Sequence, residues 1–140
     1  MNLSYLDSSV LLSLIFKDSN QNLAKKIFTT HQWVSSKLLS FECTNVLIRE
    51  SVSKKNGDKL LGSSLKVLSK LIEGINIIPI DDNVLGKLAS DRRISKGRTL
   101  DSIHIASALL IQDNYEGKLK IATFDKRLAE LAKELGFEVI

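Results

Sequence analysis

The sequence is poor in the residues that cross-link a chain, bind soft metals or anchor it in a membrane. Among 140 residues it has one cysteine, Cys43, and two histidines. One cysteine excludes an intramolecular disulfide and a zinc site built from several thiolates, and it fits a reducing compartment. No run of about 18 apolar residues occurs, and no basic segment precedes an apolar run at the N-terminus. We therefore expect a cytoplasmic protein without a disulfide, a signal peptide or a membrane span.

The length and the charge balance are those of one ordinary globular domain. Residues 1–140 contain no internal repeat, low-complexity tract or linker, and this length is typical of a single domain. Twenty lysines and arginines against sixteen acids leave a formal charge of +4. Such a mild excess is compatible with a phosphate-rich partner but does not argue for one, since most such excesses are solvated surface.

Short apolar runs alternate with amphipathic helical patterns along the whole chain. Strand-like runs are 3–6, 33–35, 75–80, 118–124 and 137–140, and helical patterns are 8–16, 20–29, 38–54, 58–73, 82–94, 100–111 and 125–135. Gly57 is expected to stop one helix, and Thr99 to be the N-cap of another. Strands separated by helices predict an α/β fold, a three-layer α/β/α sandwich with a mostly parallel central sheet.

Asp7 is the residue that most needs a partner. It interrupts the apolar stretch LSYLDSSVLLSLIF, where the strand-like run 3–6 passes into a helical pattern. An ionised carboxylate in an apolar setting costs several kcal/mol unless it is paired or coordinated. Asp125 also follows a strand-like run, and ligands bind at the carboxyl ends of the strands in sheets of this kind. These positions are the first indication of a site.

Glu42 and Asp101 lie early in helical patterns that can face the same edge of the sheet. Glu42 has apolar neighbours on much of its helix, so it too requires a partner. Asp101 and Asp125 have a simpler alternative role as first-turn or capping acids. Four converging carboxylates would repel one another, so either they do not converge or divalent cations bind them. Oxygen ligands favour Mg²⁺ or Mn²⁺ over Zn²⁺.

Four further polar residues lie next to these acids in the sequence: Ser8, Asn45, His104 and Thr123. Ser8 and Thr123 can hydrogen-bond a carboxylate or a metal-bound water, although hydroxyls at strand-to-helix turns are also routine caps. Asn45 either contacts the same site or faces solvent. For His104 we favour a hydrogen-bonded histidine near the site or in the core over a metal ligand or proton shuttle, because helical histidines more often pack than ligate.

Basic residues are frequent near the last two acids. They are Arg92, Arg93, Lys96, Arg98, Lys118, Lys120, Lys126 and Arg127. We expect most of them to be solvated surface and one or two to contact phosphate. Neither GxGxxG nor GxxxxGK[ST] occurs, so no glycine-rich phosphate loop is predicted.

In their order and spacing, four stretches resemble the PIN domain family, and within it the VapC-type toxins of prokaryotic toxin–antitoxin pairs. They are YLDSSVLL, SSKLLSFECTNVL, RTLDSIHIASALL and IATFDKRLAELAKELGFEVI, and the resemblance extends over essentially the full chain. It implies a single PIN-like domain over residues 1–140 whose acidic pocket binds Mg²⁺ or Mn²⁺ and cleaves RNA. The family's catalytic and metal-binding acids map onto Asp7, Glu42, Asp101 and Asp125. Ser8, His104 and Thr123 fall at matching positions, and Asn45 matches more loosely.

The leading hypothesis is a metal-dependent endoribonuclease that acts as the toxin of a type II toxin–antitoxin pair. The resemblance further implies a homodimer and a cognate antitoxin that inserts a segment into the acidic groove. The closest alternative is a PIN ribonuclease of RNA processing or decay without an antitoxin. A non-catalytic RNA- or protein-binding module would be favoured by a missing acid, and none is missing. A phosphatase with Asp7 as nucleophile would want a second acid at position 9, which is serine.

Overall fold

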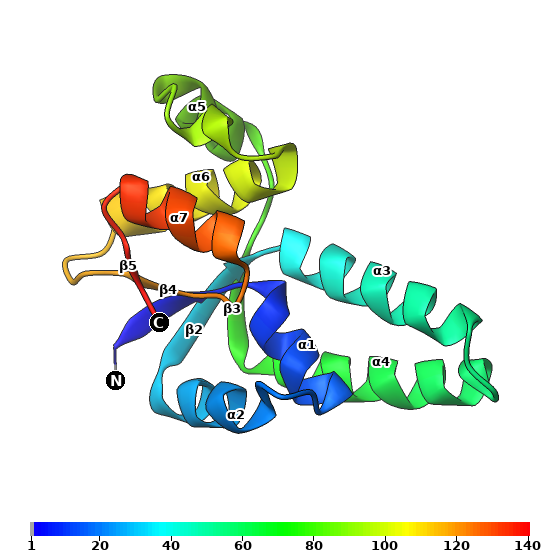
Figure 1. The fold of residues 1–140 in the computed structure, drawn as a ribbon. Helices are drawn as coiled ribbons and strands as arrows, with labels where there is room; N and C mark the ends of the chain where they lie inside the picture. The colour runs from blue at the N-terminus through cyan, green and yellow to red at the C-terminus, as the bar shows by residue number, and fades with distance from the viewer. Residues whose placement is uncertain (1) are drawn as a thin grey trace.

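Five strands and seven α-helices alternate along the chain in the computed structural model, which describes residues 2–140 (Figure 1). The strands are β1 (Leu3–Leu6), β2 (Gln32–Ser36), β3 (Ile75–Ile78), β4 (Lys120–Ala122) and β5 (Glu138–Val139). The helices are α1 (Ser8–Phe16), α2 (Gln21–Thr30), α3 (Leu38–Val52), α4 (Gly57–Glu73), α5 (Asp82–Ser90), α6 (Thr99–Asp113) and α7 (Lys126–Glu134), with a 3₁₀ turn at Ile94–Lys96. None of these helices combines the length and the apolar character that crossing a bilayer requires.

The strands form one sheet in the order β3-β2-β1-β4-β5, and every neighbouring pair is parallel. This confirms the predicted parallel sheet. β1 lies at the centre, with Tyr5 paired to Val34 on one side and to Ile121 on the other. Because β1 and β4 are neighbours and run in the same direction, the residues that follow them meet at one edge of the sheet. Asp7 and Thr123 are therefore brought together although they are far apart in the sequence.

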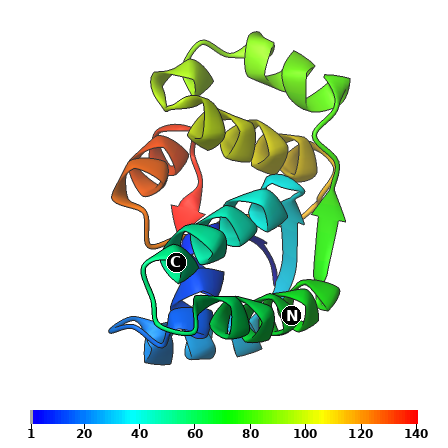
Figure 2. The ribbon, with the colours of Figure 1, turned by 90° about the vertical axis from the view of Figure 1, so that its right-hand side faces the viewer.

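Helices cover both faces of the sheet, as the predicted three-layer sandwich requires. Figures 1 and 2 show α5, α6 and α7 on one side and α1 to α4 on the other. Successive strand residues point to opposite faces, so each strand supplies both cores. Tyr5, Val34 and Ile121 join the first core, and Leu6, Trp33 and Ala122 join the second. Burial on both faces explains why the strands read as nearly continuous apolar runs.

Two predicted helix boundaries are wrong, and each has a local cause. Gly57 does not stop a helix but begins α4, and a Cβ at this position would lie 2.0 Å from the Ser51 carbonyl oxygen. Only glycine allows that close approach. Thr99 is the first residue of α6, and the N-cap is Arg98, whose side chain makes no capping hydrogen bond. Asp101, in the first turn of α6, is an acid at the end of the helix that the helix dipole favours for negative charge.

Three other elements are shorter than predicted. β3 ends at Ile78, directly before Pro79, which cannot donate a ladder hydrogen bond. The helical pattern 82–94 divides into α5 and the 3₁₀ turn. β4 covers only the centre of the run 118–124, which leaves Thr123 and Phe124 in the connection to α7. Because β4 ends early, Thr123 lies in the connection to α7, and its hydroxyl faces Asp7 at the end of β1.

Candidate active site

Asp7 is held in place through one of its two carboxylate oxygens. It follows β1, is the N-cap of α1, and is 4% exposed. Its Oδ2 accepts hydrogen bonds from the Ser9 hydroxyl at 2.6 Å, the Ser9 backbone N–H at 3.3 Å and the Thr123 hydroxyl at 2.8 Å. Donors on one oxygen fix the orientation of the side chain and leave Oδ1 turned toward other groups.

The two hydroxyls that hold Asp7 also join two strand-to-helix connections. Ser9 Oγ accepts from the Phe124 backbone N–H at 2.9 Å, and Thr123 Oγ1 accepts from the Asp125 backbone N–H at 3.0 Å. The start of α1 is thereby fastened to the segment between β4 and α7. Thr123 lies where the sequence predicted a hydroxyl. The hydroxyl partner from the start of α1 is Ser9 and not Ser8, because the N-cap geometry brings the second residue after Asp7 back to its carboxylate.

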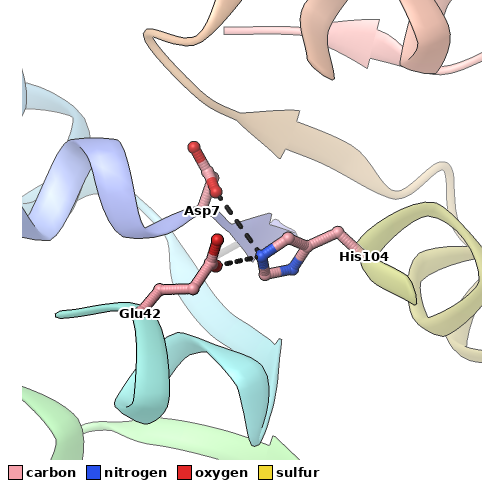
Figure 3. A group of neighbouring side chains, drawn as sticks. All are labelled: Asp7, Glu42 and His104. Atoms are coloured by element: carbon pink, nitrogen blue, oxygen red, sulfur yellow. Dashed lines mark hydrogen bonds and ion pairs between the residues drawn. The ribbon is translucent and has the colours of Figure 1, made fainter. Parts of the chain in front are cut away.

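Glu42 and His104 complete a compact cluster with Asp7 (Figure 3). Glu42 comes from α3 and His104 from α6, on opposite sides of the sheet edge. The His104 Nε2 lies 2.5 Å from Glu42 Oε1 and 3.7 Å from Asp7 Oδ1. One potential ligand atom of each side chain lies within 4.8 Å of the others. His104 is 1% exposed at its side chain and Glu42 21%, so solvent reaches the cluster past the glutamate.

The electrostatics of this cluster follow from its excess of acids. Burial opposes protonation of His104, but the hydrogen bond with Glu42 and the charges of Asp7, Glu42 and Asp101 together raise the pKa of the imidazole above its ordinary value. Burial and then the charges of Asp125 and Asp7 raise the pKa of Asp101, against a smaller opposing effect of His104. Asp101 and Asp125 therefore lie within electrostatic reach of the cluster.

The remaining two predicted acids border the cluster without joining it. Asp101 lies in the first turn of α6, partly buried. Gly97 packs against it so closely that a Cβ there would lie 3.0 Å from the Asp101 Cβ. Asp125 is exposed and is the N-cap of α7, accepting from the backbone N–H groups of Arg127 and Leu128 at 2.8 and 3.3 Å. The capping role considered for Asp125 is thus realised.

Asn45 lies apart from this cluster. It is exposed on α3 and lines a shallow hollow with Phe41 and Ile48. In residues 2–140 its side chain makes no hydrogen bond with Asp7, Glu42 or His104. Of the two places considered for it, the structure favours the solvent-facing one.

The sequence reasoning missed two residues that contact the cluster, Ser9 and Tyr5. The Tyr5 hydroxyl lies 2.7 Å from His104 Nδ1 and is fully buried. A signal was present for each. Ser9 is a second hydroxyl at a helix start, and Tyr5 brings a polar group into a strand that must be buried, so its hydroxyl needs a partner.

A cavity of about 320 Å³ opens beside Asp101, between the starts of α6 and α7. Its lining includes Lys96, Arg98, Arg127 and Glu134. Lys96 forms an ion pair with Glu134, whereas within the described chain no carboxylate lies within ion-pair distance of Arg98 or Arg127. Two cationic side chains outside any recorded ion pair thus line the cavity beside Asp101.

The donor set of the cluster suits a hard divalent cation. Asp7 Oδ1 and the second oxygen of Glu42 are not engaged by the hydrogen bonds described above, and Asp101 adds a carboxylate nearby. Oxygen donors of this kind match Mg²⁺ or Mn²⁺. The negative charges of Asp7, Glu42 and Asp101 lie close enough together to contribute to the raised pKa of His104, and a bound cation would offset such charge.

Comparisons with known proteins agree with this geometry. The PIN domain family matches residues 4–134. The chain is similar to Ribonuclease VapC46 of Mycobacterium tuberculosis, with 28% identity over 137 residues that cover 97% of this chain and 95% of the relative. Its fold is similar to that of FitAcB from Neisseria gonorrhoeae, with a TM-score of 0.69, 18% identity and coverage of 99% and 96% of the two chains. A toxin-antitoxin complex from Klebsiella pneumoniae gives a TM-score of 0.64, 21% identity and coverage of 98% and 95%.

The matched segment begins within β1 and ends with α7, so it contains every strand-to-helix connection that contributes to the acidic cluster. The chain belongs to the PIN domain family.

Proposed function

We propose that this protein is an endoribonuclease that depends on Mg²⁺ or Mn²⁺ and acts as the toxin of a type II toxin–antitoxin pair. The observation that carries the proposal is the pairing of two buried or half-buried carboxylates, Asp7 and Glu42, within 4.8 Å at the carboxyl edge of the sheet. Asp101 and Asp125 add negative charge beside them. The Mycobacterium relative is a ribonuclease, which supports RNA as the substrate.

Hydrolysis of a phosphodiester joins the oxygen of water to phosphorus, breaks a P–O ester bond and delivers a proton to the leaving oxygen. When bound, a divalent cation supplies positive charge that polarises the phosphate and acidifies a water molecule. Asp7 and Glu42 would hold that cation, with Asp101 as the third carboxylate and Asp125 acting at the rim. Ser9 and Thr123 donate to Oδ2 of Asp7, which leaves Oδ1 for the cation.

Arg98 and Arg127, which line the cavity beside Asp101, are the cations best placed to bind the RNA backbone. Some of the other basic residues considered from the sequence form ion pairs. Arg93 pairs with Asp91 and Lys120 with Glu138, which leaves their charge partly neutralised. Arginine also suits phosphate because its planar guanidinium donates two parallel hydrogen bonds.

Removing one of these arginines is expected to weaken RNA binding in a salt-dependent way. For single-stranded RNA, each lost phosphate contact reduces the steepness of the fall of log binding constant with log salt concentration by about 0.7. We expect that change for Arg98→Gln and for Arg127→Gln in fluorescence anisotropy with a labelled single-stranded RNA in EDTA. Arg92→Gln is the matched control, since Arg92 is exposed and lies outside the cavity lining. Equal slopes for all three variants would contradict the assignment.

Two protein partners belong to the proposal. We infer a cognate antitoxin, supported by the fold shared with a protein from a toxin-antitoxin complex. We also infer a homodimer, supported by the exposed apolar side chains of Phe41, Ile48 and Val52 on one face of α3, which are 64%, 46% and 82% exposed. Light scattering on the purified chain, with and without Phe41→Glu, tests the dimer. A cytoplasmic location stays part of the proposal.

The decisive experiment is cleavage of a mixed RNA pool by the purified protein with Mg²⁺, Mn²⁺ or EDTA. We expect cleavage with either cation and none in EDTA, and a loss of at least a hundredfold in Asp101→Asn. Asp58→Asn is the matched control, because Asp58 is an exposed first-turn acid of α4, far from the cluster in the sequence. If wild-type protein neither cleaves RNA nor binds a divalent cation in calorimetry, a non-catalytic binding module becomes the better assignment.

A further inference from the structure

His104 is the only member of the cluster whose role the proposed chemistry leaves undefined. Its ring nitrogens have different partners: Nε2 lies 2.5 Å from Glu42 Oε1, and Nδ1 lies 2.7 Å from the Tyr5 hydroxyl. The ring also packs edge-on against Tyr5, with centroids 5.7 Å apart. A histidine nitrogen that carries a proton cannot bind a cation. The question is therefore which nitrogen carries the proton.

The carboxylate side of the ring gives the first half of the answer. An ionised carboxylate can only accept hydrogen bonds, so the hydrogen in the contact between Nε2 and Glu42 comes from the ring. Asp7 Oδ1, 3.7 Å from the same nitrogen, adds a second negative charge that favours a proton there. Nε2–H therefore donates to Glu42.

The tyrosine side gives the second half. The Tyr5 hydroxyl accepts from the Ser36 backbone N–H at 3.3 Å, so its own proton is available to Nδ1 when the imidazole is neutral. When the ring is an imidazolium, Nδ1–H donates to the Tyr5 hydroxyl oxygen, because a phenolic hydroxyl can also accept. Tyr5 thus satisfies Nδ1 in both charge states.

We propose that Tyr5 locks His104 in the orientation and tautomer in which Nε2–H donates to Glu42, so that His104 positions Glu42 and is not itself a cation ligand. Tyr5 is the residue that makes this possible, since it serves as donor or acceptor at Nδ1 while Nε2 keeps its proton. The hydrogen bond holds Oε1 and leaves the second oxygen of Glu42 for the cation. The inference rests on the proposed function only for the statement that Glu42 serves a cation.

The chain offers a matched internal control for a test by nuclear magnetic resonance. It has two histidines, and the Nδ1 of each lies within hydrogen-bond distance of a hydroxyl on β1. The His31 Nδ1 lies 2.8 Å from the Ser4 hydroxyl, and the His104 Nδ1 lies 2.7 Å from the Tyr5 hydroxyl. Long-range proton–nitrogen correlation spectra of the ¹⁵N-labelled protein in EDTA report the tautomer of both rings. His31→Gln assigns the two sets of signals.

We expect wild-type His104 to show a protonated Nε2, and Tyr5→Phe to move its nitrogen shifts toward a mixture of tautomers. Ser4→Ala should shift the signals of His31 and leave those of His104 unchanged. A wild-type His104 protonated only at Nδ1, or shifts that Tyr5→Phe leaves unchanged, would overturn the proposal. These spectra need neither RNA nor a cation. The tautomer proposal can therefore be refuted while RNA cleavage is observed, and it can be supported when no cleavage is observed.

A cation titration keeps the proposal testable if Tyr5→Phe does not fold. Mg²⁺ is added to the wild-type protein, and the His104 signals are followed. Retention of the Nε2 proton at saturation supports a positioning role, whereas its loss shows that the ring ligates and overturns the proposal. In a folded Tyr5→Phe protein we expect the Mg²⁺ affinity to fall about tenfold, with the KM for RNA unchanged at saturating cation.

Discussion

The Ser9 hydroxyl gives the sharpest test of how the cluster is built. Ser9 Oγ donates to Asp7 Oδ2 at 2.6 Å and accepts from the Phe124 backbone N–H at 2.9 Å. Ser9→Ala removes a hydrogen bond to a charged group, worth about 1.5–3 kcal/mol, and leaves a partly buried N–H without its partner. Since Ser9 is partly exposed, water recovers some of this loss, and we expect a total of about 2–3 kcal/mol.

This loss should be visible as a lower melting temperature. Unfolding entropy of about 2.1 cal/mol/K per residue gives roughly 0.29 kcal/mol/K for 140 residues, so each kcal/mol shifts Tm by roughly 3 °C. We expect Ser9→Ala to melt roughly 7–10 °C below wild type in calorimetry in EDTA.

Ser102→Ala is the matched control for Ser9→Ala. The Ser102 hydroxyl is buried and donates to a neutral acceptor, the Ile94 carbonyl oxygen, at 2.8 Å. A neutral hydrogen bond contributes about 1 kcal/mol, so this variant should melt roughly 3 °C below wild type. If Ser9→Ala loses no more than Ser102→Ala, the charge of Asp7 is not held by the serine, and the description of the cluster is wrong.

Three further outcomes follow from the same electrostatics. Asp101→Asn should raise Tm in EDTA relative to the control Asp58→Asn. The raised pKa of Asp101 means that folding disfavours its ionised form, and the amide removes that charge. A Tm equal to or lower than that of the control would show that this carboxylate is structural. The pKa of His104 is raised in the folded protein, so its protonation stabilises the cation-free fold. This stabilisation is complete below the unfolded pKa of about 6.5 and is lost as the pH rises through the higher pKa of the folded state. If the free energies of unfolding of wild type and His104→Gln differ by a constant amount from pH 6 to 9, this expectation is contradicted. Burial, with the charges of the nearby acids, raises the pKa of the Cys43 thiol to about 12, so Ellman's reagent should react with it only after unfolding.

The order of helices and strands could be predicted because its signals are local. Apolar runs of 3–6 and 33–35 and the amphipathic patterns between them depend on neighbours in sequence. The position of Asp7 could also be predicted from a local signal, since a charged residue directly after a buried strand lies at the carboxyl edge of a parallel sheet. Gly57 shows the limit of such signals. A glycine after a helical pattern indicates a stop, whereas here its cause is a close approach to Ser51 that only the packed turn reveals.

The cluster itself was predictable in its acids but not in its contacts. Asp7 and Glu42 stand out as charges among apolar neighbours, and the structure places them together. Asp101 and Asp125 have strong local explanations as first-turn and capping acids, and Asp125 does cap α7. Sequence reasoning gave no means to choose Ser9 over Ser8, because the choice depends on how the first turn of α1 folds back on Asp7.

The geometry around His104 follows from the register of the central strand. Residues two apart in a strand point to the same face, so Tyr5 and Asp7 both face α6 while Leu6 faces the other core. A single imidazole on α6 therefore meets Tyr5 through Nδ1 and the carboxylates through Nε2. A slip of β1 by one residue would bring Leu6 under the ring and turn Tyr5 and Asp7 to the opposite face. The hydrogen bonds of Tyr5 with His104 and of Asp7 with Ser9 and Thr123 oppose that slip, because it would leave these buried polar groups without partners.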